Sequence, residues 1–355
     1  MRQKYHFEPQ KGWINDPNGL IYFKGRYHAF FQHNPYAPVW DTMYWGHAVS
    51  DDLINWQELP IALYPDMPYE NSGGCFSGSA VEKDGRLYIF YTSVSNELGQ
   101  TQSLAVSDDA VTFVKYEGNP IIGSIGVKDF RDPKVTKLMG RYYMVCGSGS
   151  GGTGRVLLYV SDDLYFWEPL GTLIEGKRFG NVIECPDFFE LDGKYVLSFS
   201  QMFTDKQRAI RTIVGSFDGM RFTPEAEYDL ETGPDYYAPQ SFLDHLGRRI
   251  VIGWMVNPRG HGQAGLDYAG AFSIPRQLFF EDGLLKGFPI AEAAPHLKGE
   301  DELVRLQGDR VTIGRESERL VTLNYLPGEG ISILRDSRSI EVFIGNGRTS
   351  ASLYV

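Results

Sequence analysis

The chain has 355 residues, of which 42% are hydrophobic and 22% charged, and this composition excludes wholesale disorder. The formal net charge of −11 argues against nucleic acid or an anionic membrane surface as a partner, because both require a basic face. Aromatic residues make up 14% of the chain and there are 40 glycines, so the composition predicts an all-β protein with many turns.

The N-terminal segment lacks the apolar run of a signal peptide, and no stretch approaches the roughly 20 apolar residues of a membrane helix. The predicted location is therefore the cytoplasm. Three cysteines, Cys75, Cys146 and Cys185, are widely spaced and odd in number. This pattern predicts small buried thiols, because it fits neither a disulfide framework nor a metal knuckle.

Five hairpin-like segments follow one another along the chain. Each has an apolar run, a glycine followed by Arg or Lys, and a second run rich in apolar residues, and the glycines are Gly25, Gly85, Gly140, Gly193 and Gly247. A second marker interleaves with them, a turn that reads Ser-Asp-Asp from Ser50, Ser107 and Ser161 and Ser-Phe-Asp from Ser216. Both markers recur about every 55 residues. A four-stranded unit repeated five times predicts a five-bladed β-propeller, and a solenoid is the alternative with such a period.

The chain beyond the repeats has a different pattern. Residues 286–300 are predicted to form a linker with a short helix that Pro295 interrupts. Residues 301–355 alternate between apolar and polar side chains, which predicts about five short strands. The predicted domains are therefore a propeller over residues 1–285, the linker, and a reduced β-sandwich-like module over 301–355 that packs on the propeller.

Polar side chains stand at the start of one predicted strand in every unit. Eight to ten residues before the hairpin glycines lie Asp16, Ser77, Asp132, Glu184 and Tyr237. If this strand is the innermost one, the three carboxylates meet at one mouth of the propeller channel. Paired carboxylates without metal ligands indicate glycoside hydrolysis, and the aromatic surplus suits a sugar-binding pocket.

Other motifs carry no comparable signal. Residues 147–154 contain a GxGxxG spacing, but the strand-like RVLLYVS follows where a dinucleotide site needs a helix. His28 and His33 are an odd number of residues apart in a strand, so they face opposite sides. There is no HExxH motif, and His47 is expected to be a structural hydrogen-bonding residue. We predict no cofactor and no catalytic metal.

Seven segments together carry a family resemblance: WINDPNGL, YHAFFQHNP, WGHAVS, FSGSAV, FRDPKV, ECPDFF and DYYAPQSF. In this order they resemble glycoside hydrolase family 32, the β-fructofuranosidases, over about residues 5–295. The resemblance implies a five-bladed β-propeller followed by a β-sandwich. It also implies retaining hydrolysis of β-D-fructofuranosides such as sucrose, sucrose-6-phosphate or short fructans.

The resemblance also implies residue roles. Asp16 in NDPNG would be the nucleophile, Glu184 in ECPD the general acid and base, and Asp132 in RDP the carboxylate that holds fructose hydroxyls and stabilises the transition state. Retention requires the carboxyls of Asp16 and Glu184 to lie about 5–5.5 Å apart. Further residues match positions that bind the sugar: Asn15, Gln32, Trp40, Phe76, Ser77, Arg131 and Tyr237.

Two features depart from the family pattern. Asp41 follows Trp40 where a small residue or Asn is more usual, which predicts an extra charge at the pocket rim. The segment after the linker is much shorter than the family's sandwich, although SRSIEVFIGNGR resembles its late motif. A shortened sandwich leaves apolar surface that a second copy of the chain could cover, so a homo-oligomer is a further hypothesis.

Three other functions remain open at this level. A related propeller furanosidase would act on arabinose polymers, although the spacing of NDPNG, RDP and ECP favours fructosides. A sugar-binding or scaffolding propeller would have no activity, although the intact carboxylate triad favours an enzyme. Transfer of fructose to another sugar instead of water is the third.

Overall fold

Five antiparallel sheets follow one another along most of the chain in the computed structural model, which describes residues 2–203, 208–256, 266–315 and 319–355. The first contains β1 Gly12–Phe23, β2 Arg26–Asn34, β3 Tyr44–Ser50 and β4 Trp56–Leu63. The second contains β5 Gly74–Lys83, β6 Arg86–Ser95, β7 Gly99–Ser107 and β8 Val114–Lys115. The third contains β9 Asp129–Leu138, β10 Arg141–Ser150, β11 Thr153–Ser161 and β12 Glu168–Gly176.

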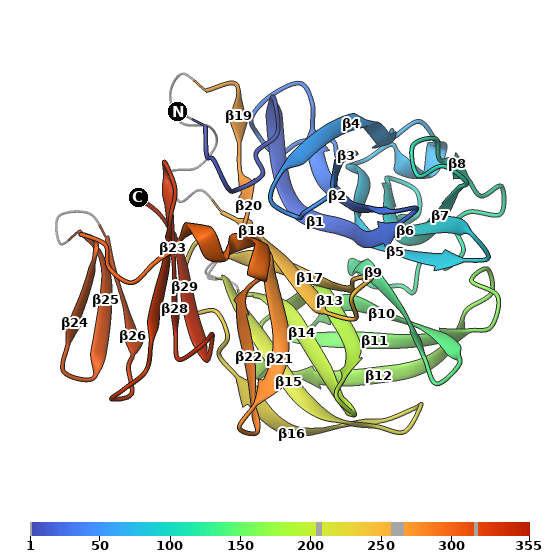
Figure 1. The fold of residues 1–355 in the computed structure, drawn as a ribbon. Coiled ribbons are helices and arrows are strands. Elements are labelled where there is room, and N and C mark those ends of the chain that lie inside the picture. The colour runs from blue at the N-terminus through green and yellow to red at the C-terminus, as the bar shows by residue number, and fades with distance from the viewer. Residues whose placement is uncertain (1, 204–207, 257–265, 316–318) are drawn as a thin grey trace.

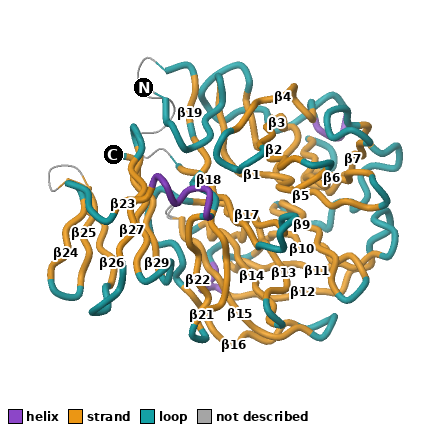
Figure 2. Tube along the Cα trace, in the orientation of Figure 1, coloured by secondary structure: helices purple, strands orange, loops and turns teal. Residues whose placement is uncertain are grey.

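The last two of these sheets follow the same order. The fourth contains β13 Val182–Leu191, β14 Lys194–Met202, β15 Arg208–Phe217 and β16 Phe222–Tyr228. The fifth contains β17 Tyr237–Leu243, β18 Arg249–Met255, β21 Arg276–Glu281 and β22 Leu284–Pro289, with β20 Ala271–Phe272 paired to β18. The helices described are three short 3₁₀ segments, η1 Pro68–Glu70, η2 Lys177–Phe179 and η3 Ala291–His296 (Figure 2).

The first strands of the five sheets form a closed ring. β1 contacts β5, β5 contacts β9, β9 contacts β13, β13 contacts β17, and β17 returns to β1 (Figure 1). β19 Tyr268–Ala269, which follows the fifth sheet's β18, pairs in parallel with β1, so a late segment completes the first sheet. These contacts confirm the five-bladed propeller predicted from the repeat, and a solenoid would have left the two ends apart.

The two repeated markers have the local structures that their residues predict. Gly25, Gly85, Gly140 and Gly193 have positive φ and follow residues that also have positive φ, as the type I′ turns of tight hairpins require. In the Ser-Asp-Asp turns the serine hydroxyl accepts a backbone N–H three residues on, for example from Leu53 to Ser50. The same bond recurs from Ala110 to Ser107 and from Leu164 to Ser161.

Two smaller sheets follow the propeller. One has the order β23 Leu297–Lys298, β27 Ile331–Arg335, β28 Ser339–Ile344 and β29 Thr349–Tyr354, and the other contains β24 Val304–Gln307, β25 Arg310–Arg315 and β26 Arg319–Asn324. Val311 and Ile313 of the second sheet share an apolar core with Ile340 and Val342 of the first. This two-layer packing is the reduced sandwich expected, with six strands described after residue 300 where about five were predicted. The division into domains at 285 and 300 stays a prediction.

A buried ionic network joins the sandwich to the propeller. Arg276 on β21 donates to Glu231 at 2.7 Å and to Glu341 on β28, and all three side chains are almost fully buried. His6, before the first strand, bridges Asp336 at 2.9 Å and Glu341 at 2.8 Å. Because a buried charge is stable only when it is paired, each member depends on the others.

His6 is positively charged in this network. Burial alone would lower the pKa of His6, but hydrogen bonds to Asp336 and Glu341 outweigh it and raise the pKa to about 9. Burial would raise the pKa of Glu341, yet Arg276 and His6 hold it at about 2.

No described helix is long and apolar enough to cross a membrane.

We expect His6→Gln to destabilise the protein most below about pH 6.5. A raised histidine pKa stabilises the folded state fully below the unfolded value of about 6.5, and this contribution is lost as the pH rises through about 9. The difference in free energy of unfolding between wild type and variant should shrink by about 3 kcal/mol over that range. Urea unfolding at pH 6 and pH 9 measures it, and an unchanged difference would contradict a charged His6.

Candidate active site

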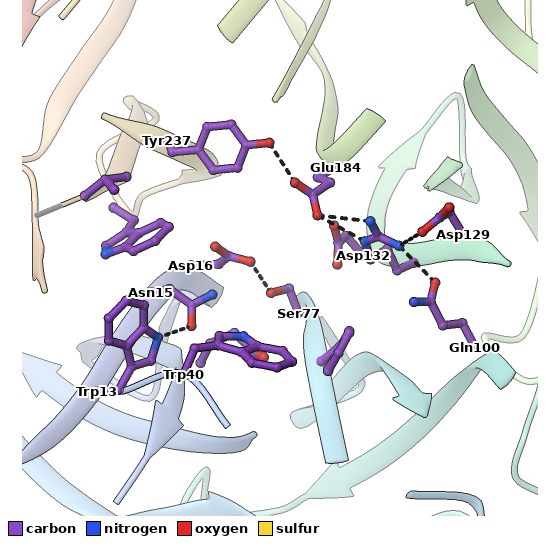
Figure 3. A pocket seen from close by; sticks show the side chains of 15 residues that line it. Trp13, Asn15, Asp16, Trp40, Ser77, Gln100, Asp129, Asp132, Glu184 and Tyr237 are labelled. Atoms are coloured by element: carbon purple, nitrogen blue, oxygen red, sulfur yellow. Dashed lines mark hydrogen bonds and ion pairs between the residues drawn. The ribbon is translucent and has the colours of Figure 1, made fainter. Parts of the chain in front are cut away.

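A cavity of about 540 Å³ opens at the mouth of the ring, at the N-terminal ends of the innermost strands (Figure 3). It is lined by Trp13, Asn15, Asp16, Gln32, Trp40, Phe76, Ser77, Gln100, Asp129, Arg131, Asp132, Glu184, Tyr237, Trp254 and Val256. These residues come from all five sheets. All ten site residues predicted from the sequence are among them.

β-Bulges interrupt every innermost strand at the level of the cavity. The ladder of β1 breaks between Ile14 and Pro17, that of β5 between Cys75 and Gly78, and that of β13 between Glu184 and Asp187. β9 and β17 break at the same level. A bulge leaves residues unpaired and bends the strand. Proline fits there because it has no N–H to offer the ladder, which explains the prolines at or beside four of the five bulges: Pro17, Pro133, Pro186 and Pro239.

Two of the expected equivalences differ by one residue at the bulges. Asp132, Cys185 and Ala238 have positive φ there, so these three are the equivalent positions. Glu184 and Tyr237 are therefore equivalent to Arg131, one residue earlier, and not to Asp132 as expected. In the fourth sheet the spacing itself contains this difference, since Asp132 and Cys185 both lie eight residues before their hairpin glycine and Glu184 lies nine. In the fifth sheet the hairpin is one residue longer.

The three equivalent residues of the last sheets form one hydrogen-bonded chain. Arg131 donates to Glu184 Oε1 from Nε at 3.2 Å and from Nη2 at 3.1 Å, and the Tyr237 hydroxyl donates to Glu184 Oε2 at 2.7 Å (Figure 3). Arg131 also donates to Asp129 at 2.7 Å and to Gln100 at 3.2 Å. Both oxygens of Glu184 are thus held by donors from neighbouring blades, which fixes the direction of its carboxyl group.

Asp16 lies in a ring of uncharged donors. The Ser77 hydroxyl donates to Asp16 Oδ2 at 2.5 Å, and the Cys185 thiol lies 3.4 Å from the same oxygen. Trp13 Nε1 donates to the Asn15 carbonyl oxygen at 2.7 Å, which leaves the Asn15 amide to bond Asp16. Burial raises the pKa of Asp16, the bonds from Ser77 and Asn15 oppose that rise, and the charge of Glu184 adds to it.

Asp132 and Asp16 both contact Cys185. Its Oδ2 accepts the backbone N–H of Cys185 at 2.8 Å and lies 3.5 Å from the Cys185 thiol. Burial raises the pKa of Asp132 to about 7, against the attraction of Arg131 and with the repulsion of Asp16 and Glu184. Asp132 therefore holds its proton up to about neutral pH, and the charges of Asp16 and Glu184 contribute to this.

Some lining residues were not identified from the sequence. Asp129 and Gln100 accept hydrogen bonds from Arg131. The sequence could have indicated Asp129, because it lies two residues before Arg131 and so on the same face of the same strand. Trp13 and Trp254 also line the cavity and contact each other edge to face at 5.6 Å between ring centroids. Asp41 is exposed and binds the Thr42 backbone N–H, and it is not among the lining residues.

Comparisons with known proteins agree with this geometry. The model of "Glycosyl hydrolases family 32 N-terminal domain" matches residues 6–288. Sucrose-6-phosphate hydrolase of Escherichia coli is 34% identical over 98% of this chain and 88% of that protein. Levanase of Bacillus subtilis is 38% identical over 78% of this chain, which spans 44% of that protein. A mutant Bombyx mori GH32 β-fructofuranosidase solved with sucrose has a TM-score of 0.86 and 30% identity, covering 100% of this chain and 89% of that one.

We expect Asp132→Asn to stabilise the folded protein at neutral pH. A buried carboxyl with a raised pKa costs stability as the pH rises from the unfolded value of about 4 through about 7, because the unfolded state loses its proton in this range while the folded state still holds it. The advantage of the variant in free energy of unfolding should grow by about 4 kcal/mol at most over this range. Denaturant titrations at pH 4 and pH 7.5 measure it. The same change at exposed Asp51 should have no such pH dependence, and a flat profile for Asp132→Asn would contradict the raised pKa.

Proposed function

Because the chain belongs to glycoside hydrolase family 32, we propose that it hydrolyses β-D-fructofuranosides such as sucrose and fructans, with retention of configuration at the fructosyl carbon. The observation that supports this most directly is the convergence of Asp16, Asp132 and Glu184 in one cavity that aromatic rings and amide groups also line. Two carboxyl groups with different environments are what double displacement at a sugar carbon requires.

In the first step we assign the attack to Asp16. One carboxylate oxygen forms a bond to C2 of fructose while the bond from C2 to the leaving-group oxygen breaks, and Glu184 gives that oxygen its proton. The donors around Asp16 are short, neutral groups, Ser77 and Asn15 among them, which orient the carboxylate without a full positive charge that would weaken it as a nucleophile.

In the second step Glu184, now ionised, takes a proton from water as the water oxygen attacks C2 and the bond to Asp16 breaks. Arg131 and Tyr237 keep the Glu184 carboxylate aimed at the same place in both steps, since they hold both of its oxygens. Asp132, held by the Cys185 N–H, is placed to accept hydrogen bonds from fructose hydroxyls and to stabilise positive charge on the ring as the transition state forms.

We expect Asp16→Ala and Glu184→Ala each to lower kcat on sucrose by about a thousandfold or more, with the fold intact, because each removes a group that forms or breaks a bond. Asp162→Ala, an exposed change on the third sheet, is the matched control. Fructose release and thermal unfolding are measured together. Proton NMR of the first product should show β-fructofuranose, and substantial activity in Asp16→Ala would exclude the covalent step.

We propose further that a second copy of the chain covers part of the C-terminal module. Leu306, Leu320 and Leu326 in this module are each about half exposed, which is a large apolar area for so small a unit. Sedimentation velocity at micromolar concentration should therefore show an oligomer, and Leu306→Lys with Leu320→Lys should shift it toward monomer. A monomeric wild type would contradict this proposal.

The cytoplasmic location stays a prediction, which fractionation of the host cell would test.

A further inference from the structure

A second cavity, of about 600 Å³, lies on the first sheet and shares no lining residue with the catalytic one. Gln32 of β2 lines the catalytic cavity, and the next residue, His33, lines this one. Successive side chains of a strand point to opposite faces, so the two cavities lie on either side of the same strand end. The volume is within the range of about 300–1,000 Å³ that is usual for small-molecule sites.

Exposed aromatic rings form one wall of this second cavity. Tyr36 is 80% exposed and Tyr64 is 49% exposed, and both line it. Tyr44 joins them edge to face, with ring centroids 5.8 Å from Tyr36 and 5.9 Å from Tyr64. Such rings lose little conformational entropy when they bind, and their faces cover the C–H faces of sugars.

The loop that carries Tyr36 is held in place before any ligand arrives. Asn34 accepts the Tyr36 backbone N–H at 3.0 Å and donates to the Val39 carbonyl at 2.9 Å. At the far end of the loop, Met43 N–H donates to the Gly73 carbonyl at 2.8 Å. The backbone that carries Tyr36 is therefore held in place, which lowers the cost of binding.

The imidazole of His47 does not serve this cavity, although the residue lines it. Its ring stacks on Phe30, with ring centroids 4.2 Å apart, on the face of the sheet opposite to Phe31 and His33. His47 Nδ1 has no described partner, but it is buried on that other face. Recognition in the cavity therefore rests on the aromatic wall and not on this nitrogen.

Few charged residues line this cavity. They are Lys11, Glu58 and Asp267, and Glu58 already accepts the Gln10 backbone N–H at 2.6 Å. The carboxylates outnumber the lysine by one, which disfavours an anionic ligand. Together with the exposed tyrosine rings, this lining favours an uncharged sugar.

The same loop reaches the catalytic cavity. Trp40, which is 50% exposed, lines that cavity and contacts Phe76, whereas Tyr36 lines the second one. From this continuity we propose that the second cavity binds the distal units of a fructan chain whose terminal fructose lies in the catalytic cavity. This proposal rests on the proposed function and names long fructans as the substrates that use the additional site.

The test compares Tyr36→Ala/Tyr64→Ala with wild type and with Phe166→Ala, an exposed aromatic change on the third sheet. We expect kcat/KM for sucrose in both variants to stay within about twofold of wild type, because sucrose is too short to span both cavities. For inulin and levan chains, the double variant should lose about tenfold in kcat/KM, mainly through KM, and Phe166→Ala should not.

Native gels that contain inulin, levan or dextran measure binding without turnover, so this arm remains informative if no sugar is hydrolysed. Retardation of wild type by a fructan, lost in the double variant and retained in Phe166→Ala, supports the site. Unchanged long-chain kinetics and unchanged retardation in the double variant would overturn it. Equal tyrosine-dependent retardation by dextran would overturn the assignment to fructans, and an equal loss of sucrose turnover in the double variant would overturn a role in distal binding.

Discussion

Three carboxyl groups held together in a partly closed cavity are the constraint on which the rest of the site depends. Burial and mutual repulsion both oppose their ionisation, as the raised pKa values of Asp16 and Asp132 indicate. One guanidinium, Arg131, and a set of neutral donors offset this cost without cancelling it. The neighbourhood of each carboxyl group differs, and this difference is what allows chemically similar side chains to take unlike roles.

Propeller geometry supplies the convergence that this cluster needs. Each blade contributes its innermost strand to the ring, and a bulge at the same level opens each ladder so that adjacent residues face the cavity. The first and fifth blades meet through contacts of β1 with β17 and through the pairing of β19 with β1, so Asp16 and Tyr237 line the same cavity. The catalytic geometry is therefore a property of the whole ring and not of any one blade.

Outside the ring, two parts of the structure stabilise or extend the site. The sandwich is small, yet Arg276, Glu341 and His6 connect it to the propeller through buried ion pairs, so the segment before β1 and the module after β22 are mutually dependent. The loop between β2 and β3 carries aromatic side chains to both sides of the first sheet. Rigid local bonding from Asn34 makes this loop part of the binding surface.

The repeat of about 55 residues was sufficient to predict the propeller, since hairpin glycines and Ser-Asp-Asp turns are local features that short segments encode. The same markers placed Asp16, Asp132 and Glu184 near one mouth, and the motif resemblance added the pocket residues. The equivalence of Glu184 with Arg131 was present in the spacing, since Glu184 lies nine residues before its hairpin glycine and Asp132 eight, but that of Tyr237 was hidden because the fifth hairpin is one residue longer. Gln100, the ion pairs of His6 and the unpartnered nitrogen of His47 were decided by the tertiary structure alone, since each depends on strands that are distant in the chain and adjacent only after the ring has closed.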